Sequence, residues 1–200
     1  MPKTPLFQRF LASQAAKPLS DAGLAQPTLL KALPKVALET TFGPLIVEID
    51  ERAAPVTAAN FLRYIDARAY DGGLFHRTVH PDNQPSNDIR IGVIQGAARK
   101  DAAQFPAIPL EPTSKTGLPH LNGTISMARS TPDSATHQFF LCIGDQPELD
   151  FGGRRNPDGQ GFAAFGRLLQ GWLVLQQIQL APAVGQSLQP PVQILRARRL

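Results

Sequence analysis

The sequence predicts an all-β domain, either a barrel or a sandwich, with two helical caps. Five short runs typical of β-strands follow one another between turn-rich stretches: 74–79, 89–95, 123–128, 138–143 and 162–168. Nineteen prolines and 16 glycines supply the turns between them. Their combined share lies below the ~25–30% that is typical of low-complexity disorder. Periodicity alone does not choose between a barrel and a sandwich.

The first elements are predicted to be a hairpin and a helix. Apolar residues alternate at period two in the runs 36–40 and 45–49, which Gly43 and Pro44 separate, and this pattern predicts a β-hairpin. A helix is expected to begin at Pro55, a residue well tolerated in a first turn. Its apolar face is predicted to contain Val56, Ala59, Phe61, Leu62 and Ile65. A second helix is predicted over residues 172–178.

The chain divides into a leader, residues 1–34, and one domain, residues 35–200. Five prolines leave room in the leader only for a flexible or partly helical segment. The domain is long enough to bury its own core. We expect a cytoplasmic location, with a periplasmic or organellar one left open, because residues 1–20 lack the uninterrupted apolar stretch of a secretory signal.

Charge and cysteine content exclude several classes of protein. The net charge is +4 and is scattered, without the basic face and stacking aromatics of a nucleic-acid binder. Arg196, Arg198 and Arg199 are predicted to form a solvated tail. Cys142 is the single cysteine, so no internal disulfide is possible, and its apolar neighbours predict a buried position. No run of about 18 apolar residues occurs, so no membrane span is predicted.

Five segments carry the functional signal: Phe75-His76-Arg77, Ile94-Gln95-Gly96, residues 123–129 (GTISMAR), residues 134–140 (SATHQFF) and Phe165-Gly166. In order and spacing they resemble the cyclophilin family of peptidyl-prolyl cis-trans isomerases over about residues 36–180. The resemblance implies a closed eight-stranded antiparallel barrel capped by two α-helices. It also implies a shallow apolar groove for a proline ring, with no metal and no organic cofactor.

The resemblance also assigns roles to residues. Arg77 is expected to be the catalytic residue, and Gln95 and Gln138 to hold the substrate backbone and orient Arg77. The expected substrate-binding residues are Phe75, His76, Val93, Gln95, Met127, Ala128, Arg129, Gln138, Phe140, Leu149 and Phe162. Within this set, Val93, Phe140 and Leu149 are expected to form the proline pocket, with Met127 behind it. Xaa-Pro peptides and unfolded or flexible segments are the expected partners of a monomeric protein.

An arginine suits rotation about an Xaa-Pro bond for a physical reason. The planar bond is stabilised by delocalisation of the nitrogen lone pair, and rotation costs about 18–20 kcal/mol. In the twisted transition state the nitrogen becomes a hydrogen-bond acceptor. A donor aimed at it therefore stabilises the transition state selectively. Arginine is always protonated and carries only donors, in a rigid fork.

The chain departs from the family pattern in three places. The segment 78–92 is long, and Gly92 stands where an aromatic residue often walls the proline pocket, unless that wall is supplied from elsewhere. Glu148 replaces an aromatic residue that contacts cyclosporin in sensitive members, so we expect weak cyclosporin binding. An insertion at residues 151–160 precedes the last predicted strand, and Phe162 replaces a histidine.

The same residues allow other interpretations. Arg77 could be an ion-paired structural residue, and the altered groove could belong to a non-catalytic proline-binding module or chaperone. His76 and His80 could hold a metal, but a strand and loop do not make them converge. Neither Ser126 nor Ser134 lies in a Gly-x-Ser-x-Gly element, and no matched histidine–aspartate pair is evident, so a hydrolase is not predicted.

Overall fold

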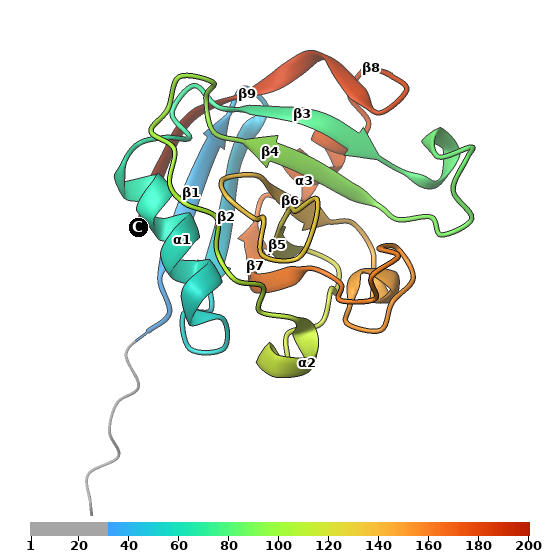
Figure 1. Cartoon of the computed structure of the whole chain (residues 1–200). Helices are drawn as coiled ribbons and strands as arrows, with labels where there is room; N and C mark the ends of the chain where they lie inside the picture. The colour runs from blue at the N-terminus through green and yellow to red at the C-terminus, as the bar shows by residue number, and fades with distance from the viewer. Residues whose placement is uncertain (1–31) are drawn as a thin grey trace, which may run out of the picture. The chain divides into compact units, whose positions relative to one another are not determined.

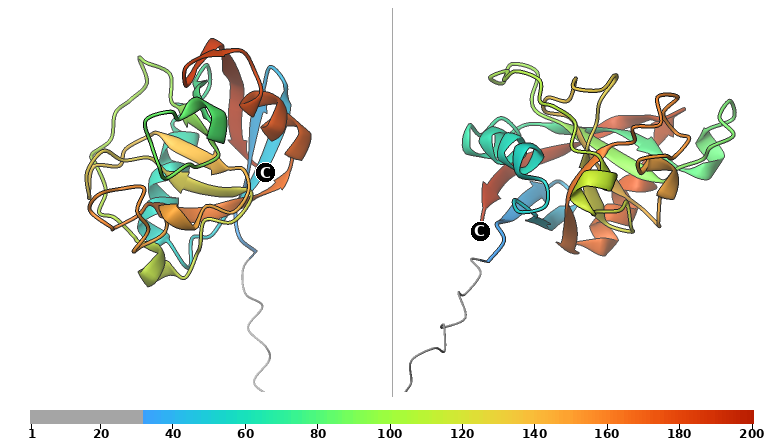
Figure 2. Two further views of the ribbon diagram at one scale, coloured as in Figure 1. Left: turned by 90° about the vertical axis from the view of Figure 1, so that its right-hand side faces the viewer. Right: turned by 60° about the horizontal axis from the view of Figure 1, so that its bottom comes forward.

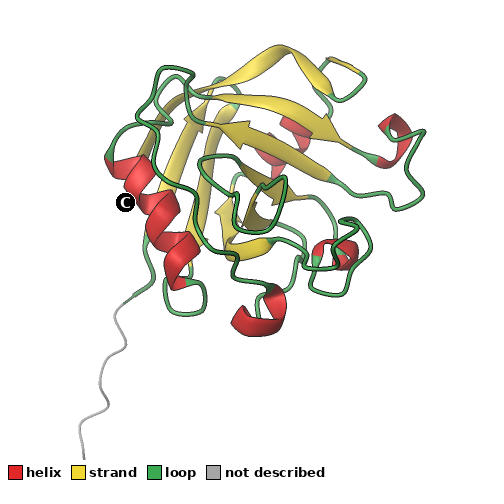
Figure 3. Cartoon of the chain, in the orientation of Figure 1, coloured by secondary structure: helices red, strands yellow, loops and turns green. Residues whose placement is uncertain are grey.

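The computed structural model describes residues 32–200, and β-strands dominate that part of the chain (Figure 3). The predicted leader therefore lies almost entirely outside the described residues. The strands are β1 (Lys35–Thr40), β2 (Gly43–Ile49), β3 (Leu74–Val79), β4 (Val93–Ala97), β5 (Thr124–Met127), β6 (Phe139–Cys142), β7 (Ala163–Gln170), β8 (Ala183–Val184) and β9 (Ser187–Arg199). The helices are α1 (Pro55–Asp66), α2 (Thr113–Thr116) and α3 (Trp172–Gln179), with 3₁₀ turns η2 (Pro81–Asn83) and η3 (Pro147–Leu149).

Eight of these strands close into one antiparallel barrel. The order around the sheet is β1-β2-β7-β5-β6-β4-β3-β9, and β9 pairs with β1 to complete the ring. The short strand β8 only extends the edge of β9. Figure 1 shows the ring, with α1 packed against it, and Figure 2 shows the same arrangement from two further sides. The expected closed eight-stranded barrel is confirmed, and ring closure removes the exposed sheet edges that a sandwich would keep.

The first hairpin forms as predicted, with a displaced turn. Val36 pairs with Val47 and Leu38 with Leu45, and these four side chains are buried. The turn lies at residues 41–42, so Gly43 belongs to β2, not to the turn. Its φ of 124° is in the region that favours glycine.

Helix α1 forms where expected, but its buried face differs from the prediction. Val56 and Ala59 are exposed, whereas Thr57 and Asn60 are buried. Polar residues can occupy that face because they are hydrogen-bonded there. The Glu111 carboxylate accepts hydrogen bonds from the Thr57 backbone N–H and hydroxyl, each at 2.7 Å. This remote acid stabilises the positive end of α1, whose own capping position is an alanine.

The C-terminal arginines are exposed to solvent as predicted, but they belong to a strand and not to a tail. Arg196, Arg198 and Arg199 lie in β9, which pairs with β1 and β3. Two of them form ion pairs across the barrel surface. Arg198 Nε lies 3.1 Å from the Glu39 carboxylate, and Arg199 Nη2 lies 2.6 Å from that of Asp66.

Buried apolar side chains form two separate clusters. The larger fills the barrel and contains an aromatic group with no exposed surface: Phe61, Tyr64, Tyr70, Phe75, Phe139 and Phe165. The smaller comprises Val79, Ile91, Val93, Phe140, Cys142 and Leu149. It draws on β3, β4 and β6, whose alternate residues face away from the barrel interior. Among residues 32–200 no helix is long and apolar enough to cross a bilayer.

Candidate functional site

Four members of the smaller cluster form the floor of a pocket of about 240 Å³ on the outer face of the barrel: Ile91, Val93, Phe140 and Leu149. Predicted site residues that line it are Arg77, Val93, Gln95, Ala128, Arg129, Phe140, Leu149 and Phe162. Strand alternation explains how the pocket is built. Phe139 points into the barrel, so its neighbour Phe140 must point outwards, where its ring meets Phe162 edge-on at 5.2 Å between ring centroids. The result is an apolar seat with the arginines Arg77, Arg129 and Arg155 around it.

Two glutamines hold the Arg77 guanidinium. Nη1 donates to Gln95 Oε1 at 2.9 Å, and Nε and Nη2 both donate to Gln186 Oε1, at 3.0 and 2.6 Å. Gln95 in turn donates to Gln138 Oε1 at 2.7 Å. These bonds use three of the five guanidinium N–H donors, which leaves one on Nη1 and one on Nη2 for a ligand.

The environment of Arg77 fixes its charge and position. No carboxylate pairs with it among residues 32–200. Burial lowers the pKa of Arg77, but an arginine starts so high that it stays protonated near neutral pH. Burial also lowers the pKa of the adjacent His76, which favours a neutral imidazole there. The site therefore presents a fixed, charged donor fork beside a neutral imidazole.

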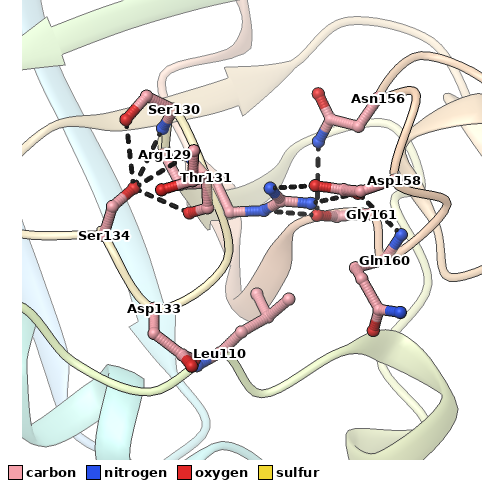
Figure 4. Close-up of polar contacts among 10 residues, drawn as sticks. All are labelled: Leu110, Arg129, Ser130, Thr131, Asp133, Ser134, Asn156, Asp158, Gln160 and Gly161. Carbon is pink, nitrogen blue, oxygen red and sulfur yellow. Dashed lines mark hydrogen bonds and ion pairs between the residues drawn. The ribbon is translucent and has the colours of Figure 1, made fainter.

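A second pocket adjoins the first and shares Gln95, Ala128 and Arg129 with it. Its remaining lining is polar: Ser130, Ser134, Thr136 and Gln138. Figure 4 shows how its rim is held. The Arg129 guanidinium donates to both oxygens of Asp158, at 2.7 and 2.9 Å, and to the carbonyl of Gly161. On the other side, the Ser134 hydroxyl accepts from the backbone N–H groups of residues 130 and 131.

The structure does not bring all predicted site residues to the pocket. Phe75 has no exposed surface and packs edge-on against Phe139 in the barrel core. Met127 is 1% exposed and belongs to the same core. His76 is half-buried and lines neither pocket. A bulge in β3 between Phe75 and Arg77 interrupts the regular alternation of faces at His76. This explains why the His76 side chain does not line the pocket that Arg77 lines.

Four residues that the sequence interpretation missed contribute to the first pocket or hold Arg77. Ile91, Arg155 and Asn156 line the first pocket, and Gln186 holds Arg77 from the turn between β8 and β9. Ile91 supplies the apolar wall that was in doubt at Gly92. A Cβ on Gly92 would meet the Ile143 carbonyl oxygen at 2.7 Å, so that position faces the neighbouring backbone and not the pocket.

A histidine, an aspartate and a serine meet behind the pocket, a set that was not evident from the sequence. His120 Nδ1 lies 2.7 Å from Asp150 Oδ1, and His120 Nε2 lies 2.9 Å from Ser126 Oγ. Ser126 has no exposed surface, so its hydroxyl cannot reach a substrate. The imidazole stacks on Phe140 with 5.9 Å between ring centroids. The triad therefore positions the pocket floor and is not a nucleophilic site.

Replacing this histidine is expected to destabilise the fold. His120→Ala leaves the buried Ser126 hydroxyl without its partner, at a cost of about 1–3 kcal/mol. Urea denaturation measures the loss. In the double variant His120→Ala/Ser126→Ala the orphaned hydroxyl is gone, so part of the loss is expected to return. An unchanged unfolding midpoint for His120→Ala would contradict this role.

Other candidate sites offer less chemistry. Among the described residues no group of three or more His, Cys, Asp or Glu could hold a metal ion. Burial raises the pKa of the Cys142 thiol, which keeps it protonated and unreactive. A larger groove of about 650 Å³ between Phe42 and α3 is lined by no charged side chain. The arginine-rimmed pocket is thus the candidate active site.

Comparison with known proteins gives a consistent result. The family model described as "Cyclophilin type peptidyl-prolyl cis-trans isomerase/CLD" matches residues 35–199. Peptidyl-prolyl cis-trans isomerase A of Dickeya dadantii is 35% identical over 144 residues, which are 72% of this chain and 70% of that protein. Peptidyl-prolyl cis-trans isomerase B of Escherichia coli is 29% identical over 153 residues, 76% of this chain and 87% of its own.

Solved structures show the same fold. A cyclophilin-type peptidyl-prolyl cis-trans isomerase from Cryptosporidium parvum superposes with a TM-score of 0.64 at 19% identity, covering 84% of this chain and 98% of that one. A second structure of that protein, determined in the presence of the dipeptide Ala-Pro, has a TM-score of 0.62 at 20% identity and covers 82% and 97% of the two chains.

Proposed function

The chain belongs to the cyclophilin-type peptidyl-prolyl cis-trans isomerase family and is an isomerase of that type, and we propose that Arg77 is the residue that lowers the barrier to rotation. The observation that supports this role is the Arg77 fork, held by Gln95 and Gln186 at the rim of an apolar pocket. A proline ring seated on Phe140, Val93 and Leu149 would place its imide nitrogen near that fork.

The proposed mechanism needs no nucleophile and no proton transfer. As the bond twists, the imide nitrogen regains its lone pair and accepts a hydrogen bond from a free N–H of Arg77. The glutamines fix the donor before the substrate arrives, so little reorganisation is needed in the transition state. The apolar seat holds the ring still while the preceding carbonyl swings.

The proposed substrates are Xaa-Pro bonds in unfolded or flexible protein segments. Both pockets lie on the protein surface, and the edge at Ala128 and Arg129 can pair with an extended backbone beside the ring seat. The Cryptosporidium structure determined in the presence of the dipeptide Ala-Pro supports a proline-containing ligand. A folded substrate would have to present its proline on an exposed loop.

Two-dimensional exchange NMR on a short Xaa-Pro peptide, with catalytic amounts of the full chain, tests this proposal. Cis–trans exchange takes tens to hundreds of seconds without catalysis, so acceleration is easily seen. Faster exchange would support the proposed site. Line broadening from binding without faster exchange would instead identify a non-catalytic proline-binding module.

Cyclosporin is expected to bind weakly. Glu148 accepts hydrogen bonds from the Arg154 backbone N–H at 2.8 Å and from its guanidinium at 2.9 Å, and this pairing lowers the pKa of Glu148. A charged pair is therefore expected at the position of the usual aromatic contact. Glu148→Trp is expected to tighten cyclosporin binding by about tenfold or more in calorimetric titration, because interfacial tryptophans often dominate binding energy. Glu148→Gln is the matched control, and tight binding by the wild type would contradict the prediction.

A further inference from the structure

Two further guanidiniums line the proline pocket, those of Arg129 and Arg155, and the rotation step uses neither. Arg155 belongs to the inserted segment 151–160 and lies half-buried beside Ile91 and Asn156. No carboxylate is paired with it in the part of the chain that the structure describes. Because desolvation of a charge costs free energy, a half-buried guanidinium without an anionic partner is a candidate contact for an anionic ligand.

Hydrogen bonds to the segment 78–92 hold the Arg155 guanidinium at one of its nitrogens, Nη1. Its Nη1 donates to Gln84 Oε1 at 3.0 Å and to the Ile89 carbonyl. Gln84 is only 2% exposed and is itself bonded to the carbonyls of His80 and Ile91. The long segment 78–92 and the insertion 151–160 thus meet at this side chain. Neither Nε nor Nη2 of Arg155 has a hydrogen-bond partner among residues 32–200, so both are available to a ligand.

Arg129 in the pocket lining and Arg154 in the inserted segment are paired with carboxylates. Arg129 is paired in bidentate fashion with Asp158, and these hydrogen bonds lower the pKa of that carboxyl to about 2. Arg154 is paired with Glu148. The pocket lining contains no aspartate and no glutamate. Arg77 and Arg155 therefore remain as two uncompensated charges around one apolar seat.

The electrostatics of these two side chains point to an anion. Burial lowers the pKa of both, and the charge of Arg77 lowers that of Arg155 further. Two like charges beside an apolar wall repel each other more strongly than in bulk water. A bound anion relieves that repulsion, and arginine N–H groups form strong charge-assisted bonds with carboxylates and phosphates.

We propose that Arg155 selects substrates that carry an anionic side chain, a carboxylate or a phosphate, on a residue next to the isomerised proline. This inference rests on the proposed function, because it requires the proline ring to occupy the pocket. Arg77 then acts on the bond, whereas Arg155 contacts the neighbouring residue through Nε and Nη2. The segments 78–92 and 151–160, which depart from the family pattern, together hold the Arg155 side chain at the pocket.

Exchange NMR on matched peptides tests the inference. Peptides of one sequence carry Glu, Gln, Lys or phosphoserine next to the proline, in one set before it and in another after it. In at least one set, kcat/KM for the Glu peptide is expected to exceed that for the Gln peptide by about three- to tenfold, as for a partly screened charge pair, with Lys below Gln. The Glu/Gln ratio is expected to fall as salt is added. A phosphoserine peptide that exceeds Glu identifies phosphate as the preferred anion.

Variants at one position connect the preference to Arg155. Arg155→Gln is expected to bring the Glu/Gln ratio close to one, Arg155→Lys to retain part of it, and Arg155→Glu to favour the Lys peptide. Arg196→Gln is the matched control, because it removes one exposed positive charge on β9, away from both pockets, and is expected to keep the wild-type ratio. Using the ratio cancels any general loss of folded protein.

The outcomes separate this inference from the proposed function. Acceleration of the Gln peptide with a Glu/Gln ratio of one in both sets would overturn the role of Arg155 and leave the isomerase site intact. A ratio that survives in Arg155→Gln would also overturn it. Failure to accelerate any peptide would refute the proposed site, and this inference with it.

Discussion

Arg77→Ala is expected to lower kcat/KM for an Xaa-Pro peptide by about 10²–10³, the loss typical of one preorganised transition-state donor. The substitution removes the two N–H groups that Gln95 and Gln186 leave free. Because the interaction with the imide nitrogen exists only in the twisted state, the loss should appear in kcat more than in KM. Exchange NMR at several peptide concentrations measures both.

The controls for Arg77 separate chemistry from structure. Arg77→Lys keeps the charge but loses the fork that two glutamines hold, so it is expected to remain strongly impaired. Denaturation of both variants in urea gives their free energies of unfolding. A loss of activity at unchanged stability supports the proposed role. Near-normal turnover by Arg77→Ala would show that the pocket accelerates rotation by seating the ring alone.

Most barrel strands could be predicted because their signal is local. The run 74–79 matches β3 at both ends, and α1 begins at Pro55 as expected. The strand β9 was missed for a physical reason. Its sequence contains Pro190 and Pro191, which argue against a central strand, and its partners β1 and β3 lie more than a hundred residues earlier in the chain. No local sequence pattern indicates pairing between strands that lie so far apart in the chain.

The site shows the same division between local and distant information. Arg77, Gln95 and Phe140 belong to compact motifs and could be proposed from them. Gln186 contacts Arg77 from 109 residues away. Arg155 meets Gln84 across 71 residues, between two segments that depart from the family pattern. Spacing in the sequence gives no information about such contacts, so only the folded chain identifies Arg155 as part of the site.

Phe139→Ala is expected to lower the free energy of unfolding by about 3–5 kcal/mol, as for other large-to-small changes at buried aromatic residues. The ring has no exposed surface and meets Phe61, Tyr70 and Phe75 edge-on, with 5.3–5.7 Å between centroids. Its removal leaves a cavity that the surrounding core is expected to fill only in part. Urea denaturation measures the loss.

The neighbouring variant Phe140→Ala is the matched comparison, because the two residues have the same side chain and opposite faces. Phe140 belongs to the smaller cluster and floors the pocket. Its loss is expected to reduce kcat/KM by about tenfold or more, since the proline ring buries less apolar surface, and to destabilise the barrel less than Phe139→Ala. Equal loss of stability with unchanged kcat/KM would place the ring seat elsewhere. A large loss of stability in Phe139→Ala, together with a large loss of kcat/KM in Phe140→Ala, would confirm the two roles. Consecutive residues of β6 would then serve the barrel core and the substrate pocket respectively.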